Sequence, residues 1–139
     1  MYKISIFNQT DHKLPENKRI VRFCKQTLRI LNVPESKFCE LEIVFVSPQK
    51  IASYNRLYLK HKGSTDIISF PNANPDKSGP ESLGSLMICP KYLDKYSLDT
   101  FQVIAHGLLH LNGYDHILQP KIWENKLNKL NYELSKIQF

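Results

Sequence analysis

One stretch of the chain constrains the fold more than any other. Residues 41–46 read LEIVFV, a short run rich in branched apolar side chains, and Ser47 and Pro48 follow it directly. Such a run is typical of a central β-strand. Serine followed by proline is typical of a helix N-cap and the first helical position. The pattern predicts a buried strand that passes straight into a helix, which favours an α/β protein.

The rest of the chain divides into similar segments. Apolar periodicity predicts strands over residues 3–7, 41–46, 67–70 and 83–89, and helices over 17–31, 48–60, 101–112 and from 120, with a short helix starting at Pro90. The Pro- and Asn-rich segment 71–82 is expected to be an exposed loop. We therefore predict one domain over residues 1–139 of the α/β (α+β) class. It has a mixed four-stranded sheet packed with about five helices.

Three of the expected helices carry a further interpretation. The helix over 48–60 is expected to bury Ile51, Tyr54 or Asn55, and Tyr58 or Leu59. The helix over 17–31 has a basic outer face with Lys18, Arg22, Lys25 and Arg29, which we interpret as solvated rather than RNA-contacting. The apolar stripe of the last helix, which begins at Trp123, is interpreted as packing alone.

Composition excludes several classes of protein. No stretch approaches the roughly 18 consecutive apolar residues of a membrane helix, and three widely spaced cysteines without a CxxC pair make neither a disulfide framework nor a cysteine zinc site. The N-terminus lacks the apolar core of a signal peptide, so we expect an unprocessed, cytoplasmic chain. The net charge of +6 is compatible with a polyanionic partner such as RNA, although it is weak support by itself.

Three of the five histidines lie within eleven residues, as His106, His110 and His116. His106 and His110 are four residues apart, so both rings leave the same face of a helix. Gly113 ends that helix and lets the chain turn back, which can bring His116 to a third corner. Three neutral imidazoles leave a fourth tetrahedral position for water, as in catalytic zinc sites. The spacing predicts one Zn²⁺ on this helix and the turn after it, with another divalent transition metal as the alternative.

A similar histidine spacing occurs in metzincin proteases, which carry Glu directly after the first histidine as the general base. That position is Gly107 here, which counts against a protease. Asp115 is the nearest carboxylate and a candidate catalytic group, either orienting a ligand or moving a proton; a plain turn residue is the alternative. His12 and His61 are expected at the surface, and His61 is also a weaker candidate for substrate contact.

The segment 106–116, HGLLHLNGYDH, resembles the signature of the YbeY family, the zinc-dependent endoribonucleases of bacterial ribosomal RNA maturation. A second family segment and the residues upstream of it match at Asn55, Tyr58, Thr65, Asp66, Ser69, Phe70 and Pro71. The resemblance spans nearly the whole chain. It implies one α/β domain, one metal held by the three histidines, and action on single-stranded RNA near the 3′ end of small-subunit ribosomal RNA.

Two positions depart from the family pattern. Leu59 stands where the family usually has an arginine that faces the substrate phosphate, and Ser85 stands where it has Asp or Glu. Arg56 lies three residues earlier on nearly the same face of the predicted helix and is our candidate catalytic stand-in, with Lys60 and Lys62 as alternatives. The candidate substrate-binding residues are Asn55, Lys60, Lys62, Thr65 and Ser69.

The leading hypothesis is a metal-dependent endoribonuclease in ribosome maturation. Its partners would be single-stranded ribosomal RNA and the small ribosomal subunit or its proteins, and no membrane. The nucleophile is either water on the metal or a substrate 2′-hydroxyl. Two alternatives stay open: a zinc-stabilised ribosome assembly factor with little or no turnover, and a metal-dependent hydrolase of another class.

Overall fold

The computed structural model describes residues 2–35, 39–71 and 82–137. Its elements are β1 (Tyr2–Asn8), α1 (Asn17–Ile30), β2 (Cys39–Phe45), α2 (Pro48–Leu59), β3 (Ile67–Pro71), β4 (Ser82–Ile88), α3 (Pro90–Lys95), α4 (Thr100–Leu111) and α5 (Pro120–Ser135). The predicted class, a mixed four-stranded sheet with five helices, is confirmed within these residues. The ends of the predicted loop, Pro71 and Ser82, belong to strands, and residues 72–81 lie outside the described residues.

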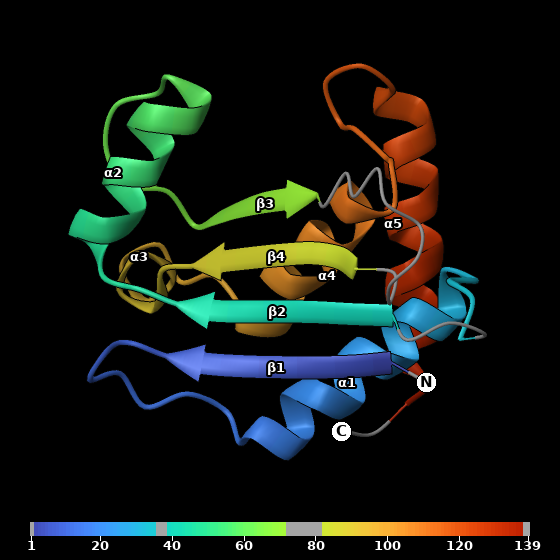
Figure 1. The fold of residues 1–139 in the computed structure, drawn as a ribbon. Helices are drawn as coiled ribbons and strands as arrows, with labels where there is room; N and C mark the ends of the chain where they lie inside the picture. The colour runs from blue at the N-terminus through green and yellow to red at the C-terminus, as the bar shows by residue number, and fades with distance from the viewer. Residues whose placement is uncertain (1, 36–38, 72–81, 138–139) are drawn as a thin grey trace.

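The strands follow the spatial order β1-β2-β4-β3 (Figure 1). β1 pairs with β2 and β2 with β4 in parallel, whereas β3 pairs with β4 antiparallel. The predicted central strand is therefore confirmed, because β2 has a neighbour on each side. β3 and β1 are the two opposite edges of the sheet.

Helices α1, α4 and α5 cover one face of the sheet, where α1 and α4 lie behind the strands in Figure 1. The main core between them is built from inward-facing aliphatic and aromatic side chains. Its members include Phe23, Leu28, Ile43, Phe45, Leu86, Ile88, Ile104, Leu108, Leu130 and Leu134. A smaller cluster under α2, on the other side, contains Val46, Ile51, Ile68, Met87 and Cys89. No helix among the described residues is long and apolar enough to cross a bilayer.

Helix α2 is attached to the sheet less extensively than the sequence predicts. Ser47 caps it by accepting a hydrogen bond from the Lys50 amide at 3.2 Å, and Ile51 and Asn55 are buried. Tyr58 and Leu59 are 64% and 47% exposed, so the prediction that one of them is buried is wrong. The reason is that α2 packs against β3, the edge strand, so its last turn meets the sheet only at its border, where the Tyr58 ring lies 5.7 Å from that of Phe70.

Helix α4 lies close against the sheet because of a glycine. The Asp99 side chain caps the helix by accepting a hydrogen bond from the Gln102 amide at 3.2 Å. At Gly107, an added Cβ would lie 2.7 Å from both Ile67 Cδ1 and Leu86 Cδ2. These side chains of β3 and β4 therefore occupy the space that any larger residue would need. The close approach places the exposed side of α4 beside β3.

Candidate active site

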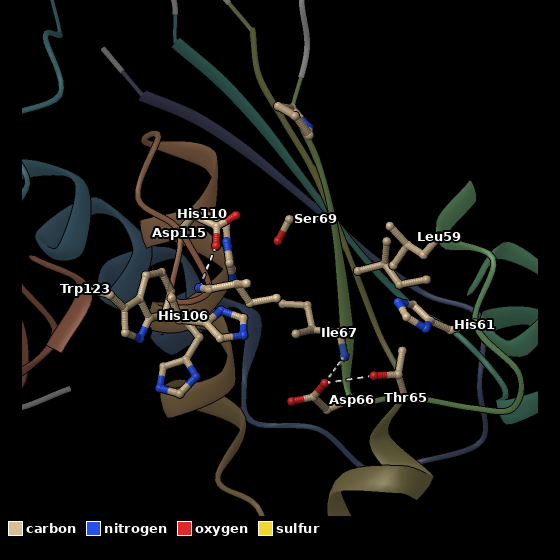
Figure 2. Close-up of a pocket in the computed structure, with 14 residues that line it drawn as sticks. Leu59, His61, Thr65, Asp66, Ile67, Ser69, His106, His110, Asp115 and Trp123 are labelled. Carbon is tan, nitrogen blue, oxygen red and sulfur yellow. Dashed lines mark hydrogen bonds between the residues drawn. The ribbon is translucent and has the colours of Figure 1, made fainter. Parts of the chain in front are cut away.

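A pocket of about 750 Å³ lies between β3, α4, the turn after α4 and the end of α2 (Figure 2). Three segments supply its lining. These are Leu59 and His61 at the end of α2; Thr65, Asp66, Ile67, Ile68, Ser69 and Pro71 along β3; and His106, His110, Asp115, His116, Ile117 and Trp123 on the α4 side. The fold thus brings the three clustered histidines to one wall and the end of α2 to the wall opposite.

The histidine wall follows from the local structure of α4. His106 and His110 lie one turn apart on its exposed side, since Gly107, Leu108 and Leu109 between them are buried. Gly113 then adopts φ +91°, a left-handed conformation that favours glycine, and the chain turns back. The ring centroids of His110 and His116 come to lie 5.2 Å apart.

Trp123 of α5 packs against all three rings. Its ring centroid lies 5.9 Å from that of His106, 4.6 Å from that of His110 and 5.5 Å from that of His116. With the side chains placed in this way, no three His, Cys, Asp or Glu residues of the described ranges form a group that could hold a metal ion. Ligation by the three histidines would therefore require their rings, and Trp123, to change orientation.

The chemistry of the donors nevertheless fits a transition metal. Burial lowers the pKa of His106, and repulsion from His116 lowers it further, against an opposing effect of Asp66. Burial also lowers the pKa of His110, and His116 acts in the same direction. Both rings are thus held in the neutral form, which is the form that binds a metal ion.

Two carboxylates lie in the pocket with different attachments. Asp66, at the start of β3, accepts hydrogen bonds from the Thr65 hydroxyl at 3.1 Å and from the Ile67 amide at 2.8 Å. Asp115 Oδ1 accepts from the Leu118 amide at 3.0 Å and the Ile117 amide at 2.7 Å. Hydrogen bonds from these two amides lower the pKa of Asp115. Asp115 therefore orders the turn and also faces the pocket as an ionised carboxylate.

The opposite wall depends on how α2 ends. Lys60 adopts φ 57°, a left-handed conformation, and the His61 amide donates to the Asn55 carbonyl at 3.2 Å. The Asn55 side chain donates to the Gly63 carbonyl at 3.0 Å, which ties the following loop to the helix. Leu59 and His61 consequently stand across the pocket from His106 and His110 (Figure 2).

The structure separates the predicted substrate-binding residues into two groups. Thr65 and Ser69 line the pocket. Asn55 is buried and bonded to the loop, so its position is structural. Arg56 and Lys62 border a different groove, with Ala52, Ser53 and Gly63. Lys60 is exposed outside the lining. Arg56, expected to replace the missing arginine, is therefore not among the residues that line the pocket.

Comparison with known proteins decides the family. The model of the family described as endoribonuclease YbeY matches residues 5–137. The chain belongs to the YbeY family. A relative from Thermodesulfovibrio yellowstonii, named endoribonuclease YbeY, is 34% identical over 71% of this chain and 70% of its own length. One from Phytoplasma australiense, with the same name, is 28% identical over 96% of this chain and 99% of its own.

A solved structure agrees at the level of the fold. The solution structure of TM1509 from Thermotoga maritima matches 96% of this chain and 92% of its own, with a TM-score of 0.52 and 18% identity. The predicted enzyme class, an endoribonuclease, is confirmed by membership of the YbeY family.

Sequence reasoning gave no functional role to two residues of this YbeY-family pocket. Asp66 lies within the second matching segment, so the signal for it was present in the sequence. Trp123 has no comparable signal, because its spacing with Leu130 and Leu134 is that of ordinary packing. The structure shows that Trp123 is packed, since it is only 8% exposed, and that its ring also lies against the three histidines.

Proposed function

We propose that the chain is a Zn²⁺-dependent endoribonuclease that cleaves single-stranded RNA in the late processing of small-subunit ribosomal RNA, near its 3′ end. The observation that carries this proposal is the pocket itself. In a member of an endoribonuclease family, it gathers three clustered histidines, two carboxylates and the hydroxyl groups of Thr65 and Ser69. The reaction would take place in the cytoplasm, with the small ribosomal subunit or its proteins as partners.

His106, His110 and His116 would hold the ion, which supplies Lewis-acid chemistry when bound. Asp115 would either orient the attacking hydroxyl group or take a proton from it. Both of its amide hydrogen bonds go to Oδ1, so Oδ2 accepts none from the described residues. Its lowered pKa keeps it ionised at neutral pH but weakens it as a base, which favours orienting that hydroxyl group through a hydrogen bond over taking its proton.

The β3 side and the end of α2 would orient the RNA. Ser69 of β3 and Thr65, which precedes this strand, carry hydroxyl groups that suit phosphate or ribose oxygens. His61 stands across from the histidine wall and offers a ring nitrogen to the same phosphate. Ile117, which is exposed beside Asp115, provides an apolar contact for a base or sugar.

One observation favours the second candidate, an assembly factor with little turnover. Among the described residues that line the pocket there is no Lys or Arg. The position for which the family resemblance implies a phosphate-facing arginine is Leu59. A charge-assisted contact to the phosphate would then be missing, and the chain would bind RNA with little or no cleavage.

The test is incubation of the purified protein with a short single-stranded RNA, with and without a chelator, followed by return of Zn²⁺. Cleavage that stops with chelator and returns with Zn²⁺ supports the endoribonuclease. Binding without cleavage supports the assembly factor. Trp123 is the single tryptophan, so its fluorescence should change during a Zn²⁺ titration if the histidines bind the ion. An unchanged spectrum together with metal-independent cleavage would overturn the metal assignment.

A further inference from the structure

Helix α1 holds most of the excess positive charge of the chain. Its 14 residues include Lys18, Arg19, Arg22, Lys25 and Arg29, and no Asp or Glu. The whole chain has 19 Lys and Arg against 13 Asp and Glu, a net charge of +6. Since α1 alone supplies five of those positive charges, the rest of the chain is close to neutral.

The fold turns these cations outward on one side. The buried residues of α1 are Ile20, Phe23, Cys24, Thr27 and Leu28, which pack into the main core. We call Lys18, Arg22, Lys25 and Arg29 the basic stripe; with Asn17 and Val21 they line an open groove of about 460 Å³. Val21 is partly buried between the cationic side chains.

Most of the basic stripe lacks a partner that would explain its charge. Arg29 Nε donates to Glu35 at 2.9 Å, and Arg19, outside the stripe, lies 5.3 Å from the centre of the Phe101 ring. Lys18, Arg22 and Lys25 form no ion pair with any residue in the ranges 2–35, 39–71 and 82–137. Lys25 adds to the effect of Arg29 in lowering the pKa of Glu35, so Lys18 and Arg22 are the cations of the stripe whose charge is most available to a ligand.

The arrangement works against the stability of the helix. Lys18 and Arg22, and Lys25 and Arg29, are like charges four residues apart, which repel each other on a helix. Lys18 also lies in the first turn, where the helix dipole disfavours a positive charge, and this turn contains no acidic residue. These charges lower the stability of the helix and, for Lys18 and Arg22, bring no compensating ion pair within the described part of the fold, which indicates that they serve another purpose.

The basic stripe is separate from the pocket. α1 packs beside β1 and against α4 and α5. β1 is the edge of the sheet opposite β3, whose residues line the pocket (Figure 1). Four strands spaced about 4.8 Å apart put at least about 14 Å between the two edges.

The sequence alone favours a solvated face, but on the structure we propose that the basic stripe is a second RNA-binding surface, which holds the phosphate backbone of a double-helical segment while a single strand enters the pocket. The identity of the polyanion as RNA rests on the proposed function. From Lys18 to Lys25 the helix rises about 10 Å, which is long enough to contact more than one phosphate of a nucleic-acid strand. The contacts would be ionic and independent of sequence.

The test compares two variants that lose the same charge. Arg22→Gln/Lys25→Gln removes the middle of the basic stripe, and Lys91→Gln/Lys95→Gln removes two exposed lysines of α3 as the matched control. Binding of a labelled blunt RNA duplex is measured by fluorescence anisotropy between 50 and 200 mM salt. The duplex offers no single strand to the pocket, so the result does not depend on cleavage.

We expect the stripe variant to bind the duplex at least tenfold more weakly at 50 mM salt. The slope of log K against log salt should be smaller by about 1.4 to 1.8, the effect of two lost phosphate contacts. The control should keep the affinity and slope of the unmodified chain. Cleavage of a short single-stranded RNA should be unchanged in both variants. If the unmodified chain does not cleave the single-stranded RNA, this would count against the proposed function but would not affect the result for duplex binding.

Several results would overturn the proposal. If both variants bound the duplex equally weakly, the effect would be a general one of net charge. If the unmodified chain bound no duplex, the proposed RNA-binding surface would be ruled out. A lowered melting temperature of the stripe variant would show that Arg22 and Lys25 stabilise the fold, whereas relief of repulsion predicts an equal or higher one. Loss of binding to anionic phospholipid vesicles with unchanged duplex binding would assign the basic stripe to a membrane surface.

Discussion

The two walls of the pocket differ in how firmly the fold holds them. The histidine wall stands on α4, of which Val103, Ile104, Ala105, Gly107, Leu108 and Leu109 are buried. The opposite wall stands on the end of α2, which buries only Ile51 and Asn55 and leaves its last turn exposed. A side chain can be exchanged at the end of α2 without disturbing the core. It is on this wall, at Leu59, that the chain departs from the family pattern.

The largest effect is expected on the histidine wall. Replacing His110 by Ala should reduce the metal content of the purified protein from about one ion per chain to nearly none, and cleavage at least a hundredfold, because loss of a ligand exceeds the roughly 10- to 100-fold cost of losing a group behind one. Elemental analysis and an RNA cleavage assay measure both. His12→Ala is the control, since His12 lies outside the pocket and pairs with Asp94 at 3.0 Å. Full metal retention in His110→Ala would contradict the assignment.

A substitution at Gly107 should disrupt the packing of α4, which carries the histidine wall, against the sheet. Gly107→Glu should lower the free energy of unfolding by about 3 kcal/mol or more, because it overpacks a buried site and places a charge there. Urea unfolding measures this, with Gln102→Glu on the exposed side of α4 as the matched control. If the two variants were equally stable, α4 would not lie as closely on β3 and β4 as we describe.

The end of α2 should tolerate a change that the histidine wall would not. Leu59→Arg should raise RNA cleavage about ten- to a hundredfold, since a charge-assisted hydrogen bond contributes roughly 1.5–3 kcal/mol if it strengthens in the transition state. Its melting temperature should change little, because Leu59 is 47% exposed. Leu57→Arg is the control, as Leu57 is 67% exposed and outside the pocket lining. Equal cleavage by both variants would show that position 59 has no catalytic part.

The smallest effect concerns pH. The pKa values of His106 and His110 are lowered in the fold, so the unfolded chain binds more protons than the folded chain as the pH falls. The stability of the metal-free protein should therefore decrease as the pH is lowered through about 6.5, the ordinary imidazole value. Urea unfolding between pH 7.5 and 5.5, with and without His106→Gln/His110→Gln, tests this. A decline of equal size in the double variant would locate the titrating groups elsewhere.

Local signals explain why the elements were predictable. Ser47 and Asp99 as helix caps, Pro48 and Pro120 at first helical turns and Gly113 after α4 act within a few residues of themselves. They mark element ends without reference to the rest of the chain. The close spacing of the three histidines is equally local, which is why a single helix and turn bring them to one pocket.

Long-range packing decided what the sequence left open. The periodicity of α2 allowed Leu59 either in the core or at the surface, and only the position of α2 at the sheet edge exposes it. The stripe of α5 predicted a packed Trp123 but not that it would pack against the histidine rings. Nor did the helical spacing of Arg56 show that it faces another groove. In each case the outcome depends on how the helix packs against its neighbours and on how the adjoining loop turns. The helical repeat of 3.6 residues determines which side chains share a face of a helix. Which residues contact that face depends on how separate elements pack.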